Sequence, residues 1–219
     1  EEAHAVTPGA SPPAPGENQL LERIAALRDL PEKNGTLAEI ARAVAASSLP
    51  RTGKRQLLFD ITTIFRFDIK TGIQRVVRAQ LSELVRNPPP GFSIKPVYLD
   101  HIGNQWLYRC GLSYLGENLG LGKITLPRGP AEFRQGDILF MPDYAPYHVS
   151  MAGRDGLYTH LKAEGVFVSA MIYDLLPLLI PDCFNDDTVI QHNLWMRELT
   201  RFADQLICIS EAVAEELRD

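Results

Sequence analysis

Short apolar runs alternate with segments of helical periodicity over residues 51–219. Most of these runs are apolar throughout, which is typical of strands in a parallel sheet that is buried on both faces. The sequence therefore predicts an α/β fold, a Rossmann-like parallel sheet with helices on both faces. The expected strands are 57–61, 92–99, 105–109, 137–141, 166–173 and 205–209.

The clearest helix is predicted over 72–86, where apolar residues recur at helical spacing until three consecutive prolines end it. Further helices are expected over 153–164 and 187–203, and Ser210 is suited to cap a last one. Residues 62–71 are expected to form a loop. Residues 111–134 are rich in glycine and are expected to form loops with short strands.

The N-terminal part differs in composition from the rest. Residues 1–17 are rich in proline and glycine and predict a flexible linker. Residues 18–50 carry amphipathic patterns and predict a short helical extension before the Rossmann-like domain of 51–219. Because the chain begins with Glu1 rather than Met, we expect it to be a piece of a longer protein.

Charge and cysteine content exclude several classes of protein. A net charge of −5 disfavours a general binder of nucleic acid. The three cysteines form no CxxC pair, and no signal-peptide pattern is present, so we expect a cytoplasmic chain without disulfides. The dinucleotide fingerprint G-x-G-x-x-G and the P-loop are absent, and the lack of an Asp-x-Asp motif predicts no metal site.

Ligands of open parallel sheets sit beyond the carboxyl ends of the strands, so the residues at these ends are the candidates for a site. Gly72 follows the first such end and opens a helix, where backbone N–H groups favour an anion. Basic residues, Arg75 among them, outnumber acidic ones around it, which suits a phosphate. The alternative is a solvated basic helix face.

Two further strand ends carry polar and aromatic side chains. Tyr144, Tyr147 and His148 follow the strand at 137–141 and are suited to stack on a sugar and bind its hydroxyls; the alternative is a packed loop with one surface histidine. Asp174 directly follows a strongly apolar strand, and a carboxylate there requires a partner or a function. It either takes part in a site or caps the next turn.

Four segments, in order, resemble the N-terminal half of family 4 glycosyltransferases, nearest to bacterial mannosyltransferase-like enzymes of polysaccharide assembly. The resemblance covers about 56–219. The segments are Phe59-Asp60-Ile61, Thr71-Gly72-Ile73-Gln74-Arg75-Val76, Tyr173-Asp174-Leu175-Leu176-Pro177 followed by Pro181, and Ala203 to Val213.

This resemblance implies one half of a GT-B fold and a retaining, metal-independent transfer of a sugar, mannose among the options. The donor is a nucleotide sugar, held mainly by a C-terminal domain that this chain lacks, and the acceptor is a growing polysaccharide or lipid-linked glycan such as lipopolysaccharide. No cofactor is implied. The fragment alone is expected to be inactive. Contact with the cytoplasmic face of the inner membrane and with other domains of the same polypeptide would fit this role.

The resemblance also implies roles for particular residues. Asp174 matches the family motif and is the catalytic candidate, and Gly72 and Ile73 match the loop that approaches the donor diphosphate. Tyr173 stands where many relatives carry histidine, and a phenol with a free pKa of about 10 cannot be the same base at neutral pH. A non-catalytic carbohydrate- or partner-binding domain of the same fold is therefore the alternative hypothesis.

Overall fold

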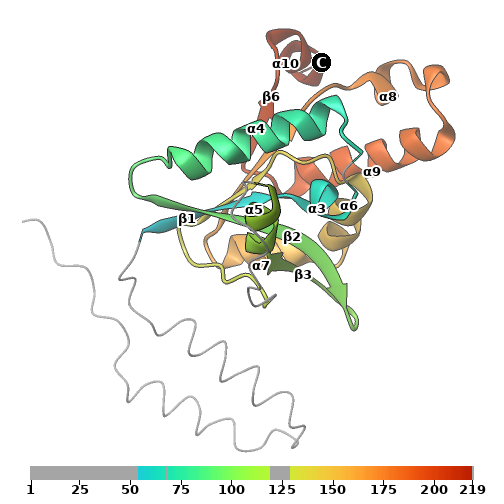
Figure 1. Ribbon diagram of the computed structural model, residues 1–219. Helices are drawn as coiled ribbons and strands as arrows, with labels where there is room; N and C mark the ends of the chain where they lie inside the picture. Colours follow the sequence, from blue (N-terminus) through green and yellow to red (C-terminus); the bar gives the residue numbers. More distant parts are fainter. Residues whose placement is uncertain (1–53, 68, 119–128, 219) are drawn as a thin grey trace, which may run out of the picture. The chain divides into compact units, whose positions relative to one another are not determined.

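The computed structural model describes residues 54–67, 69–118 and 129–218 (Figure 1). The linker and the helical extension predicted for 1–17 and 18–50 lie outside these residues.

All of the predicted strands are present and form one six-stranded sheet in the order β3-β2-β1-β4-β5-β6. The neighbours from β2 to β6 are paired in parallel, with Leu58 of β1 opposite Lys95 of β2 and Leu139 of β4. The fold class is thus the α/β class that the apolar runs predicted. The bounds are β1 Arg55–Asp60, β2 Phe92–Ile102, β3 Gln105–Cys110, β4 Ile138–Met141, β5 Phe167–Ile172 and β6 Gln205–Cys208.

One edge of the sheet departs from a purely parallel arrangement. Strand β3 runs antiparallel to β2, with Leu99 opposite Tyr108. Only Gly103 and Asn104 connect the two strands, and Gly103 has a φ of 63°. A two-residue connection can form a hairpin but cannot provide the crossover that parallel strands need.

Helices cover both faces of the sheet, and each face has its own hydrophobic core (Figure 1). Leu58 packs into the core with α6, α7 and α9, whereas the next residue, Phe59, packs into the core with α3 and α4. The helices are α3 Thr62–Arg66, α4 Gly72–Arg86, α5 Leu112–Asn118, α6 Pro146–Arg154, α7 Leu157–Ala163, α8 Leu176–Leu179, α9 Asp186–Phe202 and α10 Glu211–Arg218, and a 3-10 turn, η1, spans Pro181–Cys183.

Capping side chains begin the two longest helices where the sequence indicated. The Thr71 hydroxyl accepts a hydrogen bond from the Gln74 backbone N–H, and the Gln74 side chain accepts one from the Thr71 N–H, so that α4 begins at Gly72. The Asn185 side chain accepts a hydrogen bond from the Thr188 N–H in the same way and begins α9.

Several local expectations were wrong. The helix expected over 153–164 is two helices, because Gly156 adopts a φ of 84° between α6 and α7 and breaks the hydrogen-bond ladder. The expected loop at 62–71 contains α3, and helix α5 lies in the region expected to hold loops and short strands. Helix α6 begins at Pro146, inside the stretch that carries Tyr147 and His148.

Candidate functional site

Carboxylates follow three neighbouring strands at one edge of the sheet. Asp60 ends β1, Asp143 comes two residues after β4, and Asp174 comes two residues after β5. Because these three strands are parallel, their carboxyl ends meet at the same edge, where open α/β sheets bind ligands. The three carboxylates nevertheless have different surroundings.

A pocket of about 150 Å³ opens at this edge beside Asp174. It brings together four residues that the sequence nominated: Ile73 from α4, Tyr144 from the segment after β4, and Tyr173 and Asp174 from the segment after β5. Helix α9 and the segment before it supply much of the remaining wall. The full lining is Ile73, Tyr144, Tyr173, Asp174, Pro177, Phe184, Thr188, His192 and Trp195.

Asp174 makes the turn contact that was one of its two expected roles, and it also lines the pocket. One of its carboxylate oxygens, Oδ1, accepts a hydrogen bond from the Leu176 N–H at 3.2 Å and so caps the start of α8. The side chain is only half-buried and lines the pocket. Among the described residues no partner binds its second oxygen, Oδ2, so this oxygen can accept a hydrogen bond from a ligand hydroxyl.

The hydroxyl of Tyr173 is occupied by the protein itself. It donates a hydrogen bond of 2.8 Å to the Pro142 carbonyl oxygen, and the side chain is 9% exposed. Burial, and then the nearby Asp143 carboxylate, raise the pKa of Tyr173. Tyr173 therefore stays a neutral phenol that joins the ends of β4 and β5, and its ring rather than its hydroxyl is available to a ligand.

Tyr144 and His192 form a hydrogen-bonded pair in the pocket wall. The Tyr144 hydroxyl lies 3.0 Å from His192 Nδ1, and the edge of the Tyr144 ring meets Trp195 at 5.1 Å between centroids. Burial lowers the pKa of His192, although Asp174 acts in the opposite direction. Burial, followed by Asp174, raises the pKa of Tyr144 to about 12. Both groups are therefore neutral at pH 7.

Sequence reasoning missed the contribution of α9. Thr188, His192 and Trp195 all line the pocket from this one helix. The signal was present, since positions i, i+4 and i+7 share a helix face. Their polar and aromatic side chains on an otherwise core-facing helix distinguished this face from ordinary packing.

Four nominated residues lie outside the pocket. Gly72 and Arg75 are exposed on the first turn of α4, next to Ile73, and a Cβ atom added at Gly72 would meet nothing within 4 Å. Tyr147 is 53% exposed on α6, and the His148 ring meets Trp106 of β3 edge-on at 5.9 Å. The structure thus brings Gly72 and Arg75 near the pocket's α4 wall and separates Tyr147 and His148 from its lining.

The basic residues that outnumber the acidic ones around Gly72 in the sequence are Arg66, Lys70, Arg75, Arg78 and Arg86, and the first of them is engaged elsewhere. The Arg66 guanidinium donates hydrogen bonds to the Leu99 carbonyl oxygen at 2.6 Å and to Asp100 at 3.0 Å. Desolvation, the largest single influence, raises the pKa of Asp100, but the hydrogen bonds from Arg66 and Arg109 and the charge of Arg66 together outweigh it, so that this pKa is lowered. Arg66 therefore ties α3 to β2 and is not part of an anion site at the start of α4.

The other two carboxylates of this edge are structural. Asp60 is fully buried, and its oxygens accept hydrogen bonds from the Thr62 N–H and the Tyr108 hydroxyl, each at 2.8 Å. Asp143 accepts the N–H groups of Thr63 and Ile64 at 2.6 and 2.9 Å. Burial is the main cause that raises the pKa of Asp60 to about 6 and that of Asp143 to about 7. Both anchor α3 to the sheet.

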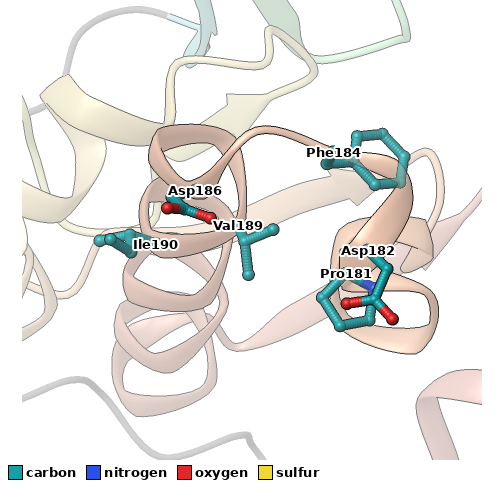
Figure 2. A pocket seen from close by; sticks show the side chains of 6 residues that line it. All are labelled: Pro181, Asp182, Phe184, Asp186, Val189 and Ile190. Atoms are coloured by element: carbon teal, nitrogen blue, oxygen red, sulfur yellow. The ribbon is translucent and has the colours of Figure 1, made fainter.

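A larger hollow of about 530 Å³ lies between η1 and the first turns of α9 (Figure 2). Pro181 and Asp182 line one side of it, and Val189 and Ile190 line the other. Phe184 lines both this hollow and the pocket beside Asp174. The hollow is more open, and none of the residues nominated from the sequence lines it.

The described residues hold neither a metal-binding cluster nor a membrane-spanning helix. In the ranges 54–67, 69–118 and 129–218, no group of three or more His, Cys, Asp or Glu side chains could hold a metal ion. None of the described helices is long and apolar enough to cross a membrane.

Comparison with known proteins finds similarity to parts of longer proteins. No protein-family model matches the sequence. Three curated proteins, each called serotype-specific mannosyltransferase WbdA of Escherichia coli, are 32% identical to it over 191 to 200 residues. The match covers 85–91% of this chain but only 22–23% of each relative, so the chain spans less than a quarter of their length.

These matches are longer than the resemblance noted from motifs. Residues 56–219, which carry the motif resemblance, make up about three quarters of the chain. The three relatives match a larger fraction of the chain, 85–91%. The similarity therefore reaches upstream of residue 56, into the segment predicted as a helical extension. That segment is thus partly shared with the relatives.

Proposed function

We propose that this chain is the acceptor-binding half of a retaining, metal-independent glycosyltransferase with a GT-B fold. The observation that carries the proposal is the pocket that joins Ile73, Tyr144, Tyr173 and Asp174 at the carboxyl edge of the sheet. The similarity to mannosyltransferases supports the same reading and makes mannose the first sugar to test. The retaining and metal-independent character rests on the resemblance to family 4 enzymes.

The composition of the pocket fits a sugar. The rings of Trp195, Tyr144 and Tyr173 offer apolar surfaces for the C–H face of a pyranose, and the carboxylate of Asp174 can accept a hydrogen bond from a hydroxyl. Such an arrangement orients an acceptor hydroxyl toward a donor held opposite, and orientation contributes substantially to rate. Asp174 is therefore the residue that we propose to act directly on the acceptor.

The beginning of α4 supplies the side of the site that would face the donor. Ile73 lines the pocket, and Gly72 beside it is exposed and has no Cβ atom to keep a ligand away. Backbone N–H groups at a helix start favour an anion, and the exposed Arg75 adds positive charge. We propose that the diphosphate of a nucleotide sugar, held mainly by another domain of the same polypeptide, approaches this helix start. Without that domain the fragment should transfer no sugar.

Exposed apolar residues next to the pocket fit a lipid-linked acceptor at the cytoplasmic face of a membrane. Pro177 of α8 lines the pocket, while its neighbours Leu176, Leu178 and Leu179 are 43%, 36% and 52% exposed. We therefore include in the proposal that the full-length protein contacts the inner membrane peripherally through α8. Flotation of the full-length protein with anionic vesicles should weaken in Leu179→Asp, and unchanged flotation would remove α8 from this role.

The decisive experiment is Asp174→Asn in the full-length enzyme, measured as initial rate against acceptor concentration. Asn caps a helix start about as well as Asp, so the melting temperature should change little. Loss of a positioned carboxylate should lower turnover by about 10²-fold or more. Asp182→Asn is the matched control, because Asp182 is an exposed carboxylate of the neighbouring hollow. Equal rates for the two variants would contradict the proposal.

A non-catalytic carbohydrate-binding domain is the second candidate. It is favoured by Tyr173, whose hydroxyl is bound to the Pro142 carbonyl and whose pKa is raised, so that it cannot supply the base that histidine offers in relatives. This candidate predicts sugar binding by the full-length protein with no transfer from any nucleotide sugar. Detectable turnover that Asp174→Asn abolishes would exclude it.

A further inference from the structure

His192 carries an unpartnered polar atom within the pocket wall. The residue is 3% exposed and lines the pocket from α9. Its Nδ1 is taken by Tyr144, whereas its other ring nitrogen, Nε2, is buried and has no hydrogen-bond partner among the described residues. A buried polar atom without a partner costs free energy, so a fold that keeps one at a pocket calls for a reason.

The charge state of His192 limits what Nε2 can do. Burial lowers its pKa, so the ring is neutral at pH 7 and has one donor and one acceptor nitrogen. Tyr144 keeps its proton, since its pKa is about 12. If the phenol donates to Nδ1, then Nε2 carries the remaining hydrogen and is a donor; if the phenol accepts, Nε2 is an acceptor. A sugar hydroxyl serves either case, because it both donates and accepts.

We propose that His192 Nε2 binds one hydroxyl of the pyranose that occupies the pocket and thereby helps to select the acceptor sugar. Tyr144 fixes the orientation of the ring through Nδ1, and Asp174 binds a neighbouring hydroxyl. Because Nε2 is covered by protein, a pocket side chain must shift as the sugar enters, a common change on binding. This inference rests on the proposed function and adds a specificity residue to it.

A protein site that hydrogen-bonds a sugar hydroxyl strongly rejects a sugar analogue that lacks this hydroxyl, whereas an apolar site rejects it only weakly. The position of the bound hydroxyl can therefore be found with deoxy sugars. His192→Asn places an amide near the Nδ1 position and can keep the contact with Tyr144, but it removes the Nε2 function. His192→Gln returns a polar group toward the Nε2 position. His160→Asn is the control, because His160 lies on the exposed surface of α7.

The experiment measures KM and kcat of the full-length enzyme for methyl α-D-mannopyranoside and for its 2-, 3-, 4- and 6-deoxy analogues as acceptors. With the wild type, one deoxy analogue should raise KM by about tenfold, the size expected for one hydrogen bond. In His192→Asn that analogue and the parent sugar should perform equally, while the KM for the donor stays unchanged. His192→Gln should recover part of the discrimination, and His160→Asn should retain all of it.

Two different failures can be told apart. If Asp174→Asn abolishes turnover but His192→Asn discriminates among the analogues as the wild type does, the proposed function stands and the role of His192 is overturned. A melting temperature that falls in His192→Asn with no change in acceptor KM leads to the same conclusion. If the wild type neither binds nor uses any of the sugars, both the proposed function and this inference fail.

Discussion

Asp60 and Asp174 stand at equivalent places, each at the carboxyl end of a parallel strand, yet their environments differ. Asp60 is fully buried and accepts hydrogen bonds from Thr62 and Tyr108, and burial raises its pKa to about 6. Asp174 is half-buried, makes one capping contact and lines a pocket. The comparison teaches that a carboxylate after an apolar strand indicates a polar contact with the protein, while its accessibility decides whether an oxygen also stays open to solvent.

The largest expected effect comes from removing the buried member of this pair. Asp60→Ala leaves the Thr62 N–H and the Tyr108 hydroxyl without their acceptor inside the core. We expect a loss of about 3 kcal/mol or more in the free energy of unfolding, because several buried donors lose their partner at once. Urea denaturation measures it. Asp174→Ala is the matched variant and should cost about 1 kcal/mol or less; similar losses in both would erase the distinction.

The pH dependence of stability sharpens the same comparison. Asp60 and Asp143 have pKa values of about 6 and about 7 in the folded protein, raised from 3.8, so folding favours their protonated forms. Their contribution is fully present below about pH 4 and is lost as pH rises through 6 and 7. We expect Asp143→Asn to reduce the fall in stability between pH 4 and 8 by up to about 4 kcal/mol. A slope that Asp143→Asn leaves as steep as in the wild type would contradict the assignment of Asp143.

A substitution at Gly72 tests the solvent-accessible part of the site at the carboxyl edge of the sheet. Its position is open, so Gly72→Val should fold with nearly the wild-type melting temperature. A branched side chain at the helix start should nevertheless hinder the approach of a phosphate, and we expect kcat/KM of the full-length enzyme to fall by about tenfold. Ala79→Val adds the same side chain to an exposed position further along α4 and serves as the control. Parallel losses of stability and activity would show Gly72 to be merely structural.

The smallest expected effect concerns Tyr173. Tyr173→Phe removes the hydrogen bond to the Pro142 carbonyl and should lower the free energy of unfolding by about 1 kcal/mol. Because the hydroxyl is already bound by the protein, turnover should change by less than about threefold. Thermal melts and initial rates of the full-length enzyme measure the two quantities. A drop in rate as large as that of Asp174→Asn would mean that the phenol takes part in the chemistry after all.

The local sequence pattern was sufficient to predict an element of the fold where a single physical rule determined that element. Each strand of the described sheet was predicted, and the inner strands β1, β4 and β5 were the clearest because a strand buried on both faces reads as an apolar run. The helices predicted over 72–86 and 187–203 from their periodicity are present as α4 and α9, and the capping contacts of Thr71 and Asn185 were found only in the structure. The antiparallel direction of β3 was not foreseen from its composition, although the two-residue connection before it required that direction. The break at Gly156 was missed because a single glycine can lie within a helix or end one.

The sequence by itself determined the α/β class and the strand segments, and it placed Tyr144 and Asp174 after strand ends. The resemblance to family 4 glycosyltransferases added Ile73 and Tyr173. Only the tertiary structure decided which nominated residues share a pocket. Tyr147 and His148 separated from it because Pro146 begins a helix that carries them toward β3, whereas His192 joined it from a helix more than forty residues further along the chain. The physical reason is that periodicity fixes which face of an element a side chain occupies, whereas packing of distant elements fixes what that face meets.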